Sequence, residues 1–229
     1  MKTRMVLWLV ALAAVVGTSG PAHALNGTSM GAGISFTNTL GATDYGDNPM
    51  GWAFTPLTNI TITHLGFFDT QADGLATSHD VAIYPISSST PLVSGTVPAG
   101  TAGLLIGDGA ANHPSYYGGY WRYTDVADTL LLSNTTYVVA AHPEGDGTPT
   151  SPGSNWALFE NHPWITLGDS YFISSTTLVN PAVGGVNVGP LGSPNGYPSP
   201  NFLILPEPSS LMLLGVGAIL LWRRRGRAE

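Results

Sequence analysis

The chain has 229 residues, of which 43% are hydrophobic and 9% charged, and it contains no cysteine. Its formal net charge is −7 at pH 7, although six of its seven basic residues lie near the two ends of the sequence. This composition excludes disulfide bonds, cysteine-ligated metals and thiol nucleophiles, and the acidic balance opposes binding to nucleic acid.

The first 24 residues have the three parts of a secretory signal peptide. Two basic residues precede an apolar run over residues 5–16, and a stretch of small residues then ends in Ala22-His23-Ala24. The apolar run has 12 residues, fewer than the roughly 20 that a membrane span needs, and the small residues after it are typical of a signal peptidase site. We therefore predict export across the inner membrane, with cleavage before Leu25.

Residues 25–205 are predicted to form a single all-β domain. They contain twelve acidic residues but only one lysine or arginine, Arg122. Short runs rich in β-branched and aromatic residues alternate with clusters of Gly, Pro, Ser, Thr and Asn, and no long stretch has a helical period. Such spacing is typical of a β-sandwich or jelly roll. The predicted strands are residues 34–40, 60–68, 81–86, 92–97, 104–106, 120–126, 129–132, 137–142, 155–159, 165–167, 171–174 and 202–205.

Two details of this pattern predict local features. Ile60 and Ile62 alternate with threonines, but the alternation slips at His64-Leu65, which predicts a β-bulge. Residues 180–200 are rich in Gly, Pro and Asn, so they are predicted to form a long surface loop before the last strand.

The middle of the domain, residues 51–142, resembles a β-sandwich domain of unknown function that recurs in bacterial surface proteins. The features that carry the resemblance are residues 51–54, Leu65-Gly66, Gly74-Leu75 with His79 and Val81, the aromatic strand at Trp121 and Tyr123, and Thr136-Tyr137-Val138. It implies a β-sandwich fold and no catalytic residue.

The residues capable of chemistry do not form a catalytic pattern. The domain has no lysine, which excludes Schiff-base catalysis, and its five histidines show no H-E-x-x-H or other tight metal spacing. Residues 27–31 match G-x-S-x-G, but they lack the preceding strand that a nucleophile elbow needs. We expect no enzymatic activity, and we expect the histidines to be ordinary loop or rim residues.

Three aspartates surround one turn, in the stretch DTQADGLATSHD. Asp69, Asp73 and Asp80 offer oxygen ligands at short spacing around a flexible glycine, which suits Ca²⁺. The spacing is not that of an EF-hand, and the alternative is a solvated loop whose aspartates cap turns. A Ca²⁺ site is therefore a hypothesis, and no other cofactor is expected.

The aromatic residues suggest a second kind of binding site. Trp121 and Tyr123 lie on one predicted strand. If such residues were exposed on a β-sandwich, they would stack on sugar rings. The alternative is packing in the core, which is the commoner use of aromatic side chains.

The last 24 residues form a distinct segment. Counted from Pro208, its apolar run reaches about 22 Å as a helix, short of the roughly 30 Å of a hydrocarbon core. The arginines that follow are costly to translocate and should stay on the cytoplasmic side, so the tail is predicted to hold the protein in the membrane only briefly. Its parts, in order, are Pro206, Glu207 and Pro208, the apolar residues 211–222, and Arg223, Arg224, Arg225 and Arg227.

This order of parts resembles the PEP-CTERM sorting signal of Gram-negative bacteria. The resemblance implies recognition near Pro206-Glu207-Pro208 by an exosortase, a membrane-embedded enzyme similar to cysteine transpeptidases. It also implies release or attachment at the surface of a bacterium that makes exopolysaccharide. The alternative is a plain single-span anchor.

Together these features predict an exported, non-enzymatic surface or matrix protein associated with exopolysaccharide and biofilm. Its expected partners are signal peptidase and an exosortase during export, the inner membrane transiently, and extracellular polysaccharide. The alternative is a carbohydrate-binding module, with or without Ca²⁺.

Overall fold

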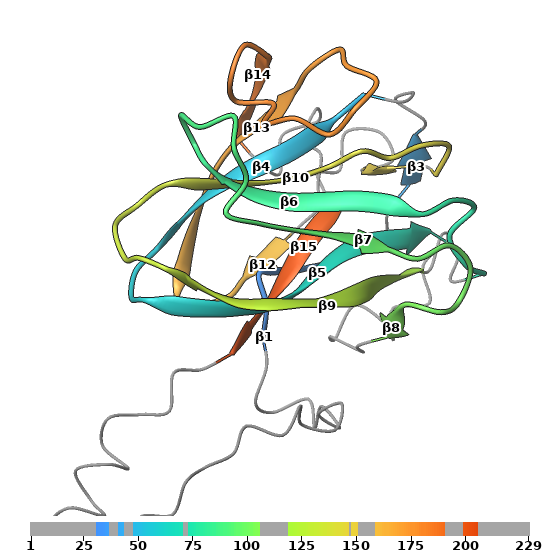
Figure 1. Cartoon of the computed structure of the whole chain (residues 1–229), viewed down its shortest axis with the longest axis horizontal. Helices are drawn as coiled ribbons and strands as arrows, with labels where there is room; N and C mark the ends of the chain where they lie inside the picture. The colour runs from blue at the N-terminus through green and yellow to red at the C-terminus, as the bar shows by residue number, and fades with distance from the viewer. Residues whose placement is uncertain are drawn as a thin grey trace, which may run out of the picture.

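The computed structural model describes residues 31–36, 41–43, 48–70, 73–105, 119–146, 148–150, 159–190 and 199–205. These residues form antiparallel strands and the turns between them, and no helix occurs among them. Two larger sheets pack face to face around a shared core, as in a β-sandwich (Figure 1). The predicted all-β sandwich is therefore confirmed.

The first sheet has five strands in the order β1-β15-β5-β9-β8. Its central strands β5 and β9 are long and pair along nearly their whole lengths. The bounds are β1 Gly31–Ala32, β5 Ile60–Thr70, β8 Leu104–Leu105, β9 Gly119–Leu131 and β15 Pro200–Leu205.

The second sheet has six strands in the order β14-β13-β4-β10-β6-β7. Two further pairs are short, β11 with β3 and β12 with β2. The bounds in the second sheet are β4 Met50–Pro56, β6 His79–Pro85, β7 Val93–Val97, β10 Tyr137–Ala141, β13 Ile165–Phe172 and β14 Val186–Pro190. The short strands are β2 Ile34–Phe36, β3 Gly41–Thr43, β11 Thr148–Thr150 and β12 Phe159–Asn161.

The sequence pattern predicts the strands better than their ends. The predicted strands 120–126 and 129–132 form one continuous strand, β9. The register of β5 against β9 shifts between Ile62 and His64, so the predicted bulge is confirmed close to the slip in the sequence. The predicted loop 180–200 is wrong in part, because β14 forms an edge strand inside it.

The central strand β4 was not predicted because its pattern does not alternate. Nearly all of its residues are buried, since the strand is covered on both faces. Gly51 permits a close approach to β10, because an added Cβ would clash with the carbonyl oxygen of Val139.

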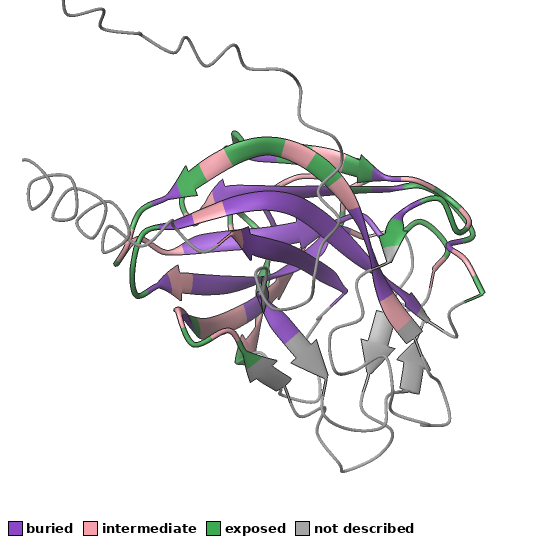
Figure 2. Cartoon of the chain, turned by 90° about the horizontal axis from the view of Figure 1, so that it is seen from below, coloured by how far each residue is buried: buried purple, intermediate pink, exposed green. Residues whose placement is uncertain are grey.

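Aromatic side chains fill the space between the two sheets. Trp52 of β4 stacks on Phe202 of β15 with ring centroids 5.6 Å apart, and Phe54 lies 4.5 Å from the same ring. The indole N–H of Trp52 also donates to the carbonyl of Pro200 at 2.8 Å. Because large buried rings contribute most to the burial of apolar area, this cluster joins the two sheets. Figure 2 shows the burial concentrated in the central strands.

The outer face of the six-stranded sheet is partly covered as well. Leu178 and Ala182, from the segment between β13 and β14, pack on a second, smaller core that contains Tyr84. The side-chain amide of Asn180 fixes this segment, because it donates to the carbonyls of Pro85 and Ser88 at 3.1 and 2.8 Å.

The described residues include no helix long and apolar enough to cross a membrane. The predicted signal peptide, its cleavage site before Leu25 and the predicted sorting tail all lie outside the described residues. The domain bounds 1–24, 25–205 and 206–229 therefore stay predictions.

Candidate functional site

A groove opens on the outer face of the six-stranded sheet, over β6 and β7. Along β6, Asp80 and Tyr84 point outward, while the residues beside them point into the core. Ser94 and Thr96 lie on the paired strand β7 and line the same side. The groove has a volume of about 440 Å³, and Leu178 forms part of its wall.

The groove combines hydrogen-bonding groups with apolar surface. The hydroxyl of Thr96 donates to the carboxylate of Asp80 at 2.6 Å. Burial, and then the charge of Asp80, raise the pKa of the Tyr84 phenol above its ordinary value, so this hydroxyl keeps its proton. Polar groups beside the apolar Leu178 suit a small, hydroxyl-rich ligand.

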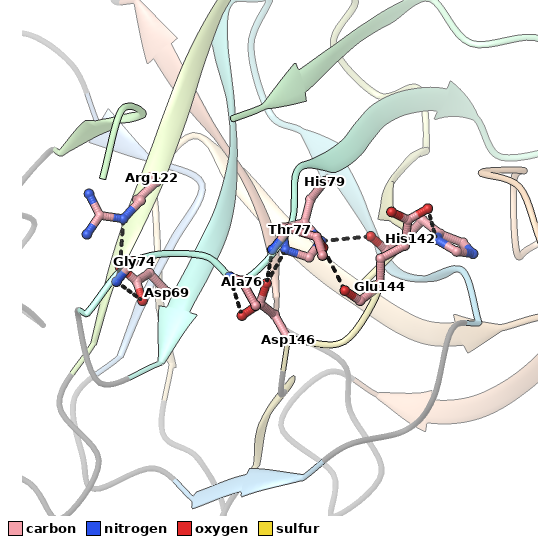
Figure 3. Close-up of polar contacts among 9 residues, drawn as sticks. All are labelled: Asp69, Gly74, Ala76, Thr77, His79, Arg122, His142, Glu144 and Asp146. Atoms are coloured by element: carbon pink, nitrogen blue, oxygen red, sulfur yellow. Dashed lines mark hydrogen bonds and ion pairs between the residues drawn. The ribbon is translucent and has the colours of Figure 1, made fainter. Parts of the chain in front are cut away.

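A second polar cluster lies at the end of the sandwich where β5 leads into β6 (Figure 3). Asp69 is 1% exposed, and its Oδ2 accepts from Nε of Arg122 at 2.6 Å and from the backbone N–H of Gly74 at 3.1 Å. Burial, and to a lesser extent the charge of Asp73, raise the pKa of the Asp69 carboxyl above its ordinary value, although Arg122 and Gly74 act to lower it. Gly74 has a φ of +112°, a conformation that favours glycine, so Asp69 caps a turn that a glycine makes possible.

Asp146 is the centre of a separate network. Its carboxylate accepts from the backbone N–H groups of Ala76 and Thr77 at 2.9 and 3.3 Å, and it lies 2.7 Å from Nε2 of His79. The other ring nitrogen of His79 lies 3.0 Å from the carbonyl oxygen of His142. Partial burial raises the pKa of the Asp146 carboxyl, but these hydrogen bonds outweigh it, so the pKa lies below its ordinary value.

The ring of His79 is held on every side. It is 0% exposed and stacks on Phe67 with centroids 3.9 Å apart and 9° between the planes. Each ring nitrogen lies within hydrogen-bond distance of a protein oxygen, Nε2 of the Asp146 carboxylate and Nδ1 of the His142 carbonyl. Both ring nitrogens are thus occupied by protein groups. We call the contacts of His79, Asp146, Ala76 and Thr77 the loop clasp, because they join residues 74–79 to residues 142–146.

The loop clasp continues into the next residues of the second loop. The hydroxyl of Thr77 donates to the carbonyl of Glu144 at 2.6 Å, and Nδ1 of His142 lies 3.1 Å from the carboxylate of Glu144. Glu144 has a φ of +36° and Gly145 a φ of +85°. A positive φ at a residue other than glycine costs on the order of 1–3 kcal/mol, and the hydrogen bonds of the clasp offset this cost at Glu144.

The structure does not bring the three predicted Ca²⁺ ligands together. Asp69 is buried against Arg122, Asp80 faces the outer groove beside Thr96, and Asp73 is exposed in the turn between them. Among the described residues, no group of three His, Cys, Asp or Glu side chains could hold a metal ion. The Ca²⁺ hypothesis is therefore corrected for these three residues, because Asp69 caps a glycine turn and the three carboxylates do not converge on one site.

Trp121 and Tyr123 are core residues rather than a platform for sugars. They are 0% and 1% exposed and belong to the main core, where Phe68 packs edge-on against Trp121 at 5.0 Å. A ring can stack on a sugar only when one of its faces is open. The stacking hypothesis is therefore wrong for this pair.

The sequence interpretation also missed the loop clasp and the groove. His79 lies in β6 and is 0% exposed, and His142 is 4% exposed although it follows the end of β10, so neither is an exposed rim residue. The alternation in HDVAIYP does place Asp80 and Tyr84 on one face of β6. No local signal, however, pairs His79 with Asp146, which lies 67 residues later.

Comparison with known families identifies the C-terminal segment. The family model of the PEP-CTERM protein-sorting motif matches residues 205–225, which include the Pro-Glu-Pro sequence and three of the four clustered arginines. The predicted resemblance of the tail is therefore confirmed. No curated protein sequence matches the chain. A motif of this kind implies an exported protein that an exosortase processes at the envelope or surface of a Gram-negative bacterium.

Proposed function

We propose that this chain, a PEP-CTERM protein, is a non-enzymatic structural or adhesive component of an extracellular polysaccharide matrix. The sorting motif at residues 205–225 is the observation that carries the proposal. The internal pairing of the polar side chains supports it, because Asp69 binds Arg122 and His79 binds Asp146. Groups engaged in such contacts stabilise the fold and are not free to act on a substrate.

The position of the last strand suggests how the tail is used. Leu205 pairs with Thr61 at the end of β15, and the next residue, Pro206, has no N–H with which to continue the ladder. The Pro-Glu-Pro sequence therefore follows directly on the folded domain. In this proposal the apolar residues 211–222 hold the protein in the inner membrane, with the arginines on the cytoplasmic side, until the exosortase acts.

Processing at both ends is the expected result for the exported protein. Mass spectrometry should find an N-terminus at Leu25 and loss of the arginine-rich end, with the cut close to Pro206-Glu207-Pro208. Replacing Arg223, Arg224, Arg225 and Arg227 together by serine should weaken retention in the membrane before processing, because the stop-transfer effect depends on that charge.

Two results would count against this account. An exported form that still ends at Glu229 would leave only a permanent anchor. Unchanged membrane retention of the four-serine variant would show that the charge does not hold the tail.

The groove favours a carbohydrate-binding module as a second candidate function. Asp80, Thr96 and Tyr84 line a single groove of about 440 Å³. The Thr96 hydroxyl donates to one oxygen of the Asp80 carboxylate, which leaves the other carboxylate oxygen for a ligand. Sugars are bound through such groups next to apolar surface. Because the domain is acidic, a neutral saccharide suits the groove better than an anionic one.

Replacing Asp80 by asparagine should weaken saccharide binding about tenfold, which corresponds to the loss of one hydrogen bond to a charged group. The probe is a panel of neutral and anionic exopolysaccharide oligomers, with affinity measured by calorimetry. Asp128→Asn is the matched control, because it removes the same charge from the exposed face of β9. Equal affinities of wild type and Asp80→Asn would eliminate the groove as the binding site.

A further inference from the structure

One end of the sandwich carries exposed leucines. The turns 57–59 and 132–136 meet there, because the N–H of Ser133 donates to the side-chain oxygen of Asn59 at 2.9 Å. We call this region, on the left of Figure 1, the leucine end. Its exposed residues are Leu57, Leu130 and Leu132, with exposed fractions of 50%, 53% and 53%.

The last strand, β15, also ends at the leucine end. Leu205, the last residue of β15, pairs with Thr61, and Thr61 pairs on its other side with Leu130. Side chains of paired residues in antiparallel strands lie on the same face. Leu205 and Leu130 therefore lie on one face, two strand spacings or about 10 Å apart.

The length of the connecting segment limits how far this end can lie from a membrane. Five residues, 206–210, separate Leu205 from Leu211, where the apolar run of the tail begins. The six residue steps between them span at most about 20 Å. The other end of β5 is about 35 Å further away, since the strand has 11 residues.

Most of the acidic residues whose positions the structure describes lie away from the leucine end. The turns 57–59, 86–92 and 132–136 lie at the leucine end and contain no charged residue. Five acids lie at the opposite ends of β5, β6 and β10, namely Asp69, Asp73, Asp80, Glu144 and Asp146. One exposed acid, Asp128 of β9, lies two residues before Leu130. Anionic headgroups repel acids, so the leucine end, which is the less acidic of the two, is the one that can approach a bilayer.

We propose that the leucine end docks on the surface of the lipid bilayer while the tail is inserted. This inference rests on the membrane-held stage of the proposed function. The half-buried Trp164, whose carbonyl accepts from the N–H of Leu57 at 2.7 Å, adds an aromatic residue at the same level, as is common at membrane interfaces. Docking holds Pro206-Glu207-Pro208 at the membrane, where the membrane-embedded exosortase acts.

The absence of cysteine from the sequence makes a direct test possible. The full chain is labelled at single introduced cysteines with a fluorophore and reconstituted into vesicles of phosphatidylethanolamine and phosphatidylglycerol, with and without brominated lipids. The variants are Leu132→Cys and Leu57→Cys at the leucine end, and Leu213→Cys in the tail. Leu104→Cys is the matched control, because Leu104 of β8 is 42% exposed and pairs with Tyr123, far from the leucine end.

The labels at Leu132 and Leu57 should be quenched several-fold more than the label at Leu104, and the label at Leu213 should be quenched most. Quenching at Leu213 with equal, weak quenching at Leu132, Leu57 and Leu104 would overturn docking and leave the inserted tail intact. Quenching at Leu132 without quenching at Leu213 would support docking but overturn the membrane-held tail. If neither is quenched, both are overturned.

Discussion

Replacing Arg122 by methionine should lower the free energy of unfolding by about 3–5 kcal/mol, because it leaves a buried carboxylate without its cation. Arg122 is 4% exposed, and its Nε lies 2.6 Å from Asp69, which is 1% exposed. Residues 25–205 contain no other lysine or arginine that could replace it. Unfolding in urea, followed by tryptophan fluorescence, measures the loss.

A double variant keeps this prediction testable if the single variant does not fold. Arg122→Met combined with Asp69→Asn should recover most of the lost stability, because the buried charge is then absent. The asparagine can still accept from the N–H of Gly74, as the carboxylate does. A single variant as stable as wild type, or a double variant no more stable than the single one, would contradict the argument.

Replacing Asp146 by asparagine should cost about 2–3 kcal/mol at pH 7, because hydrogen bonds to a charged group are lost. The carboxylate is only 18% exposed and lies 2.7 Å from Nε2 of His79. Its loss should also loosen residues 142–146, which hydrogen exchange would detect as faster exchange of the amides of Ala76 and Thr77. Asp128→Asn, at an exposed position on β9, should change stability by less than about 0.5 kcal/mol.

The effect of Asp146→Asn should depend on pH in a definite direction. The folded pKa of Asp146 lies below its ordinary value, so the unfolded chain takes up this proton at a higher pH than the folded protein does. The stability from the carboxylate is then complete above the unfolded pKa of about 3.9 and is lost as the pH falls through the folded pKa. The difference between wild type and variant should shrink in acid, and a difference that is constant from pH 7 to pH 3 would contradict the role of the charge.

The hydrogen bonds of Asp69 and Asp146 stabilise the end of the sandwich opposite the leucine end. Asp69 and Asp146 are each held by donors from the turn that links β5 to β6. These hydrogen bonds fix the turn. The groove, the loop clasp and the leucine end thus occupy different parts of one domain, so variants in each can be tested separately.

Much of this protein was determined by the sequence alone. The sorting tail needs no tertiary contact to be recognised, because its three parts follow one another along the chain, and the family match confirms it. The all-β class also follows from local pattern, since β-branched runs and turn residues repeat at short spacing. The bulge in β5 was visible for the same reason, because it interrupts an alternation between neighbouring residues.

Tertiary structure alone decided which side chains are buried and which meet. The sequence left open whether Trp121 and Tyr123 pack in the core or face solvent, and the packing of the second sheet places them in the core. β4 was not predicted because burial on both faces removes the alternation that marks a strand. Asp69 and Arg122, which form a hydrogen bond, are 53 residues apart in the sequence, and His79 and Asp146 are 67 residues apart. Such pairs depend on strand register, which is fixed by contacts between distant segments and leaves no local trace in the sequence.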